Sequence, residues 1–133
     1  MTIPVSMQFG SRINNISNGQ SRNWVLLWKN PAPADSFAGQ TIQLDLQTFD
    51  AVFVAGGSDK NFWGSVIVPK GYTGAIRFPL QSGSNVRWRT RDVTCTDTGV
   101  IFGDATYNTQ GSSTTTTQNT GAIPLFIYGI KFG

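Results

Sequence analysis

Hydrophobic residues in this chain recur in short runs, and several of these runs have the period of two that is typical of β-strands. The clearest lies at 41–47, where Ile42, Leu44 and Leu46 alternate with threonine, glutamine and aspartate. Such alternation predicts a strand with one buried face and one face in water. The segment 24–28 (WVLLW) is apolar throughout, and it predicts a buried strand.

Further strands are predicted along the rest of the chain, separated by turn-forming glycine, proline and asparagine residues. One of these strands begins at 51, and the others cover 62–68, 72–80, 86–90 and 100–102. The polar stretch 109–121 (TQGSSTTTTQNTG) is expected to be a mobile loop. The final run 123–132 (IPLFIYGIKF) is too apolar for the edge of a sheet, so we expect it to return to the centre of one.

These eight or nine strands favour a single all-β domain. A chain of 133 residues is enough for one domain, and neither a repeat nor an amphipathic helix is visible in it. Glutamate is absent and β-branched or aromatic residues are plentiful, which favours strands over helices. We therefore predict an antiparallel β-sandwich, jelly-roll-like, over 23–133, preceded by an N-terminal arm or weak first strand at 1–22.

The missing residue types exclude several kinds of active site. Without histidine there is no Ser-His-Asp triad, no Cys-His pair and no histidine-bound zinc. A glycosidase with two carboxylates would need a pair of aspartates, and no such pair is recognisable. The single cysteine, Cys95, allows neither an internal disulfide nor a thiolate cluster, and we expect it to be partly buried and inert. We predict no catalytic residues and no cofactor.

Metal binding and nucleic-acid binding are not predicted either. Asp59, Asp97 and Asp104 lie in loops that could offer oxygen ligands to calcium, but turns favour aspartate in any case. A net charge of +3 is well below the dense basic face of a nucleic-acid binder. The longest apolar run is far shorter than the roughly 20 residues of a membrane-spanning helix, and no signal peptide is visible. We therefore expect synthesis in a reducing cytoplasm and no membrane insertion.

Three arginines two residues apart, Arg87, Arg89 and Arg91, are the first candidate for ligand binding. A strand places them on one face, where the guanidinium groups could hold carboxylate or phosphate groups of a surface polymer. The alternative is structural: they could pair with aspartates such as Asp45 or Asp104, or with a neighbouring subunit. The structural alternative is favoured.

Aromatic residues are the second candidate, because sugars stack on flat rings beside amide and carboxylate groups. Trp63 lies next to a loop that holds Asp59 and Asn61, and Tyr72 follows a lysine and a glycine. These four residues are the candidate sugar-binding set. Large aromatic side chains more often fill β-sandwich cores. The core is the expected place for Trp24, Trp28 and Trp88.

Three segments carry a resemblance to a known group of proteins. They are the block 24–54 (WVLLWKNPAPADSFAGQTIQLDLQTFDAVFV), the segment 91–102 with its ending GVIF, and the ending 122–133 (AIPLFIYGIKFG). Together they resemble the C-terminal domains of tail-tip, tail-fibre or baseplate-associated proteins of bacteriophages and prophages, particularly those of gut bacteria. The resemblance covers most of the chain after the arm, and it supplies no catalytic residues.

The resemblance implies a virion structural domain that is often trimeric and sometimes contacts the host surface. We therefore expect a non-enzymatic phage or prophage tail protein at or near the receptor-binding tip, made in the host cytoplasm and located in the virion. Its expected partners are two further copies of itself, other tail proteins and a host cell-surface polysaccharide. Such proteins usually carry a longer N-terminal region than the 22 residues here, so we expect a small separate tip protein or another means of attachment.

Two alternatives come from other classes of function. A monomeric carbohydrate-binding module would use Trp63, Tyr72 and the polar side chains near them. A glycan hydrolase would use two aspartates, and it is the less favoured of the two because no aspartate pair is recognisable.

Overall fold

The structure is a computed structural model that describes residues 5–6, 8–10 and 23–133. Two short strands that pair with each other, β1 (Val5–Ser6) and β2 (Gln8–Gly10), fall within the predicted arm, whose other residues lie outside the described ones. The remaining strands form two antiparallel sheets, and the described residues include no helix. No element in this part of the chain could therefore cross a membrane as an apolar helix.

The smaller sheet has four strands. Its order is β3 (Trp24–Lys29), β12 (Ile123–Ile130), β5 (Ala51–Ser58) and β6 (Asn61–Pro69). The apolar C-terminal run is thus central, as predicted, since β12 pairs with β3 on one side and β5 on the other. The strand predicted at 24–28 is present, but the prediction that it is buried is wrong. β3 is an edge strand, and its outward side chains Trp24 and Leu26 are exposed.

The larger sheet is organised along one long strand, β8 (Asn85–Thr96). One side of β8 pairs with the whole of β7 (Thr73–Ser82), from Asn85 to Thr94. The other side pairs first with β10 (Thr106–Thr109) and then with β9 (Gly99–Phe102). Beyond these lie β11 (Thr115–Thr117) next to β10 and β4 (Gln40–Gln43) next to β9.

The hydrophobic core lies between the two sheets. The two sheets approach closely at Gly64 of β6, which has no side chain. A Cβ at this position would lie 2.9 Å from the ring of Phe78 on β7. Burying these side chains is the main driving force for folding. The fully or almost fully buried residues of the core include Leu46, Val52, Val54, Val68, Ile76, Val93, Cys95, Val100, Phe102, Ile123 and Ile127.

The predicted antiparallel β-sandwich is confirmed. The outer strands wrap as in a jelly roll, because the first strand of the sandwich, β3, pairs with the last, β12, and β4 pairs with the late strand β9. In the middle of the chain, β5–β6 and β7–β8 are direct hairpins. The alternation of burial predicted at 41–47 is also confirmed, because Leu46 is buried while its neighbours Asp45 and Gln47 are exposed, but the predicted strand is shorter and ends at Gln43.

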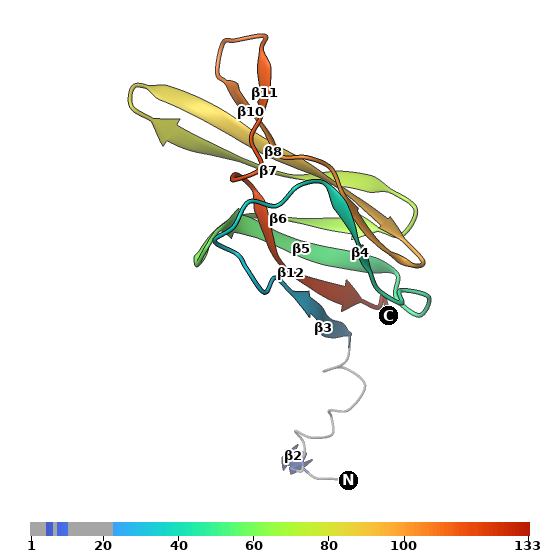
Figure 1. Cartoon of the computed structure of the whole chain (residues 1–133). Helices are drawn as coiled ribbons and strands as arrows, with labels where there is room; N and C mark the ends of the chain where they lie inside the picture. Colours follow the sequence, from blue (N-terminus) through green and yellow to red (C-terminus); the bar gives the residue numbers. More distant parts are fainter. Residues whose placement is uncertain (1–4, 7, 11–22) are drawn as a thin grey trace.

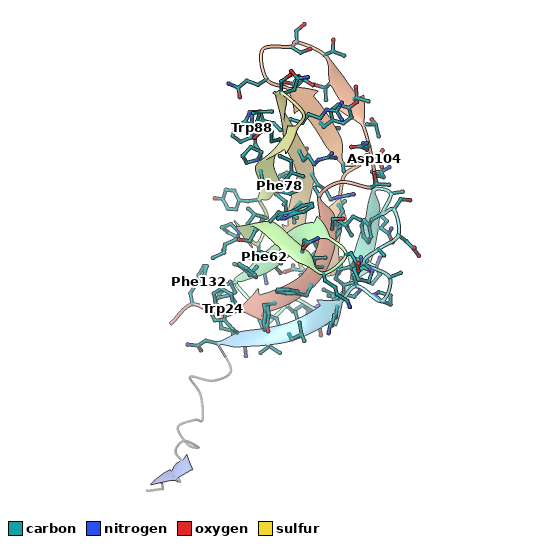
Figure 2. All side chains as sticks on the ribbon, turned by 90° about the vertical axis from the view of Figure 1, so that its left-hand side faces the viewer. Trp24, Phe62, Phe78, Trp88, Asp104 and Phe132 are labelled. Atoms are coloured by element: carbon teal, nitrogen blue, oxygen red, sulfur yellow. The ribbon has the colours of Figure 1, made fainter. Side chains whose placement is uncertain are left out.

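One part of the larger sheet projects beyond the smaller one (Figure 1). It consists of residues 79–82 of β7 and 85–90 of β8 together with β10 and β11, and we call it the sheet extension. The prediction of a mobile loop over 109–121 is wrong in part, since residues 115–117 form β11 and pair with β10. Figure 2 shows Trp88 of the extension and Trp24 of β3 at opposite ends of the domain.

Candidate functional site

The outward face of the four-stranded sheet carries a row of apolar side chains that crosses all four strands. Tyr128 pairs directly with Leu26 on one side and with Phe53 on the other, and Phe53 pairs with Ile67. Residues that are directly opposite in antiparallel strands project from the same face. With Trp24 and Phe126, which contact this row, these residues form what we call the aromatic face.

The aromatic side chains of this face pack against one another and remain open to solvent. The ring of Phe53 lies 5.3 Å from that of Trp24, and the ring of Tyr128 lies 5.6 Å from that of Phe126, measured between centroids. Trp24 is 46% exposed, Leu26 50% and Ile67 51%. Ordered aromatic contacts on an exposed surface create a fixed apolar platform.

Charge is almost absent from the sheet that carries the aromatic face. Across β3, β12, β5 and β6, all of which lie in the described part of the chain, Lys29 is the only charged residue. It lies at the rim, where it helps to line a hollow of about 210 Å³ with Leu26, Phe126 and Tyr128. The face is therefore apolar over its centre with a single basic group at one end.

Arg91 is wholly inside the protein, so its prediction as a ligand-binding residue is wrong. It has no exposed surface. Its guanidinium donates from Nε to the carbonyl of Ala122 (2.8 Å), from Nη1 to that of Gly103 (2.7 Å) and from Nη2 to that of Phe37 (2.8 Å). Burial lowers the pKa of Arg91 to about 10, and Arg91 is still protonated at neutral pH because this value lies well above 7.

The structural alternative for Arg91 thus describes it correctly, with a different partner from the expected one. Arg91 binds backbone carbonyls of three loops, while Asp104 influences it only at longer range. Asp104 itself accepts hydrogen bonds from the Gly39 amide (2.8 Å) and from Asn119 Nδ2 (3.1 Å). These bonds hold the pKa of Asp104 below its usual value.

Arg87 and Arg89 do share a face, on the sheet extension and beside Tyr107. The guanidinium carbons lie 4.5 Å and 5.9 Å from the centre of the Tyr107 ring, respectively. Arg89 also donates to the side chain of Gln118 and packs against Gly121, where a Cβ would clash with its guanidinium. Partial burial and the neighbouring Arg87 both lower the pKa of Arg89.

The opposite face of the extension has a second arginine–aromatic pair. The guanidinium of Arg77 lies 4.9 Å from the ring centre of Trp88, which is partly exposed on the outer side of β8. The prediction that Trp88 belongs to the core is therefore wrong. Trp28 is the one of the three tryptophans expected in the core that does pack against it, next to Phe37 and Phe102.

The candidate sugar-binding set is divided between two ends of a strand. Trp63 is at the start of β6, where it is 41% exposed and contacts Phe78; Asn61 is the first residue of the same strand, and Asp59 is in the turn before it. Tyr72 follows the end of β6. From Trp63 to Pro69 the extended strand spans roughly 20 Å, and the Tyr72 amide donates to the Pro69 carbonyl in the turn that follows, so Tyr72 and Trp63 do not form one platform.

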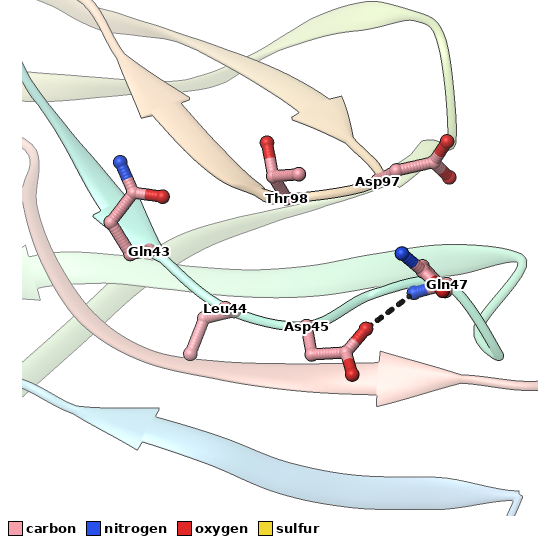
Figure 3. Close-up of a pocket in the computed structure, with 6 residues that line it drawn as sticks. All are labelled: Gln43, Leu44, Asp45, Gln47, Asp97 and Thr98. Carbon is pink, nitrogen blue, oxygen red and sulfur yellow. Dashed lines mark hydrogen bonds between the residues drawn. The ribbon is translucent and has the colours of Figure 1, made fainter.

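The hollow in Figure 3 contains two of the chain's aspartates, but both are engaged in local structure. Asp45 accepts a hydrogen bond from the backbone amide of Gln47 (3.1 Å), and Asp97 forms an ion pair with Lys70 (3.0 Å). Backbone hydrogen bonds join the two walls, from Leu44 to the carbonyl of Thr98 and from Leu46 to that of Asp97. The hollow is therefore the junction of two hydrogen-bonded loops, and its aspartates have structural partners.

The three aspartates considered as calcium ligands lie apart in the fold. Asp59 is in the β5–β6 turn, Asp97 is paired with Lys70 in the β8–β9 turn, and Asp104 binds Gly39 and Asn119. Within the described ranges, no three acidic or cysteine side chains come close enough to share an ion. Cys95 is buried, and this burial raises the pKa of its thiol.

The aromatic face is the feature that the sequence analysis did not identify. A signal for it existed, because a strand of a two-layer sandwich needs only one apolar face. The runs at 24–28 and 123–130 are apolar at nearly every position, which means that their second face is apolar too.

No family model matches this chain, and comparisons with curated proteins and with solved structures found no match either.

Proposed function

We propose that this protein is a non-enzymatic structural component of a phage or prophage tail, at or near the tip, and that it assembles as a homotrimer through the aromatic face. The observation that carries the proposal is this face, which crosses all four strands of one sheet with side chains as exposed as Leu26 and Ile67. Contiguous exposed apolar surface of this kind marks an interaction site.

A copy of the same chain is the occupant that the charges favour. When three copies of a chain turn the same surface toward a three-fold axis, like charges on that surface repel one another, whereas apolar groups do not. The sheet contains Lys29 alone as a charged residue, and Lys29 lies at its rim. Aromatic residues at the centre with charge at the rim is the composition expected of a protein–protein interface.

The segments that carry the resemblance to phage tail proteins also build this surface. The block 24–54 includes β3 and Phe53 of β5, and the ending 122–133 is β12 with its flanks. The resemblance implies a trimer, and the apolar pattern on both sides of β12 supports a partner on its outward side. Location in the virion and contact with other tail proteins are part of the same proposal.

Light scattering behind a sizing column, at several concentrations, tests the assembly. The expected result is a stable mass of three chains, and a double Leu26→Asp, Ile67→Asp variant is expected to run as a monomer. The matched control is Ile101→Asp, since Ile101 is a similarly exposed side chain, 43%, on the other sheet. A monomeric wild type at every concentration would refute the proposed assembly, and a trimeric double variant would exclude this face.

A monomeric carbohydrate-binding module is the second candidate, and one observation favours it. The indole of Trp63 is exposed on the edge strand β6, two residues along the chain from the amide of Asn61. This candidate predicts a weak, saturable glycan affinity that Trp63→Ala abolishes and Trp24→Ala leaves intact. Circular dichroism would check the fold, since Trp63 packs on Phe78. Unchanged glycan binding by Trp63→Ala would remove this platform.

A further inference from the structure

The face of the sheet extension that continues the core side of β8 is basic and lacks a compensating charge. Arg89 pairs across the sheet with Phe78 on β7 and with Tyr107 on β10, and Tyr107 pairs with Thr116 on β11. Arg87 lies one pair further out, opposite Leu80 and Thr109. We call the surface made by Arg87, Arg89, Tyr107, Thr109 and Thr116 the arginine face.

No acid of this chain neutralises these two arginines. All seven aspartates lie in the described part of the chain, and the ion pair found there joins Lys70 to Asp97. Burial and then the nearby Arg87 lower the pKa of Arg89, and the second cause is the effect of two positive charges held close together. Two neighbouring guanidinium groups with no counter-charge attract an anion from outside.

The position of Arg89 is fixed before any ligand arrives. Its guanidinium is held by Gln118 and by contact with the backbone at Gly121, and it lies against the Tyr107 ring. Its Nε is buried and has no hydrogen-bond acceptor among the described residues. A fixed, partly desolvated guanidinium loses little conformational entropy on binding and forms stronger hydrogen bonds to oxyanions.

We propose that the arginine face binds an acidic polysaccharide, with Arg87 and Arg89 holding its carboxylate or phosphate groups. The residues around the pair favour a sugar polymer, because the hydroxyls of Thr109 and Thr116 lie on the same face and the side-chain amide of Gln118 is held against Arg89. Hydroxyl and amide groups match the hydrogen bonding of sugar hydroxyls. Further positive charge, which a nucleic-acid site needs along its length, is lacking on these two strands.

This site does not depend on the proposed trimer, since a single chain supplies all its residues. Titration calorimetry at low salt can test it with trigalacturonate and, as a neutral control of the same size, its methyl ester. A glycerol phosphate trimer distinguishes phosphate from carboxylate as the bound group. The expected result is saturable binding of at least one of the two anionic oligomers, with affinity that falls as salt is raised.

The variants Arg87→Gln and Arg89→Gln are each expected to weaken binding about tenfold, the effect of losing charge-assisted hydrogen bonds. Arg77→Gln is the matched control, because Arg77 also stacks on an aromatic ring but lies on the other face. Arg87→Gln is the cleaner variant, since Arg89 also supports Gln118. Equal loss in Arg77→Gln, equal binding of the methyl ester, or no binding of either anion would overturn the proposal. So would tighter binding of a short single-stranded DNA.

The same titration with the Leu26→Asp, Ile67→Asp variant separates this proposal from the assembly. Binding per chain is expected to be unchanged in that variant, because the aromatic face and the extension lie on different parts of the domain (Figure 2). Loss of binding together with loss of assembly would overturn the single-chain site.

Discussion

At the scale of single residues, three arginines spaced two apart on β8 have three different surroundings. Arg87 is partly exposed beside Tyr107, Arg89 is held by Gln118 and Gly121, and Arg91 is fully buried. The reason is that β8 runs from the extension into the sandwich, so one strand face passes from solvent to core within five residues. The same residue type can therefore bind a ligand at one end and support the fold at the other.

Arg91→Gln is expected to lower the free energy of unfolding by about 3 kcal/mol, because the substitution removes the guanidinium and leaves the buried carbonyls that it satisfies without their donors. The carbonyls belong to Phe37, Gly103 and Ala122, so three loops loosen at once. Urea unfolding measures the change. The control is Arg77→Gln: because Arg77 is exposed on the surface, its replacement should change the free energy of unfolding by less than about 0.5 kcal/mol. An equally small change in the free energy of unfolding for Arg91→Gln would contradict the conclusion that Arg91 holds the three loops together.

Asp104 makes the stability of the fold sensitive to acid. Hydrogen bonds from Gly39 and Asn119 lower the pKa of Asp104, so at acidic pH the unfolded chain binds its proton first. This contribution is complete above the unfolded pKa of about 4 and is lost as pH falls through the lower, folded pKa. Asp104→Asn keeps an acceptor oxygen for Gly39 but does not titrate. Urea unfolding between about pH 5 and pH 2 should show a shallower loss for Asp104→Asn than for wild type, and parallel curves would contradict this.

At the scale of elements, the pairing of β4 with β9 requires a glycine at the start of β9. A Cβ on Gly99 would lie 2.4 Å from the carbonyl oxygen of Ile42, and a backbone atom cannot rotate away. Gly99→Ala is therefore expected to cost about 2 kcal/mol or more in unfolding free energy. Gly103→Ala is the control, because its nearest contact would be an ordinary 3.6 Å to the Asp92 side chain. Equal stability of the two variants would show that the β4–β9 edge adapts.

How well each element could be predicted depends on how its two faces are covered. The alternation around Ile42 was readable because one face of that segment is buried and the other is in water. β10 and β11 were not predicted, because neither belongs to the buried core and both consist of threonine, tyrosine and asparagine. Where neither face enters a core, no period of two is imposed on the sequence.

The same argument explains which parts of the candidate sites could be predicted. The spacing of Arg87 and Arg89 places them on one strand face, and the structure has them there. The burial of Arg91 could not be predicted, because its carbonyl partners come from loops 12 to 54 residues away in the chain. The distance between Trp63 and Tyr72 depends on β6 continuing unbroken to Pro69.

At the scale of the whole molecule, the domain has two surfaces of opposite character at different places. The aromatic face on the four-stranded sheet is apolar and nearly uncharged, while the arginine face on the extension carries two uncompensated charges. Assembly through the first surface would bring three copies of the second into one particle. Several weak sites on a rigid particle bind a repeating polymer far more tightly than one site does.

Assembly also predicts how the stability of the molecule depends on its concentration. If folding is linked to trimer formation, mass action stabilises the folded chain as concentration rises, and Tm should increase by about 5 °C over a hundredfold range. In the Leu26→Asp, Ile67→Asp variant, Tm should not depend on concentration, whereas Ile101→Asp should behave like wild type because its side chain projects from the other sheet. Scanning fluorimetry at several concentrations measures all three. A wild-type Tm that is as independent of concentration as that of the double variant would mean that the aromatic face does not join copies of this chain while it folds, and some other molecule would then have to cover it.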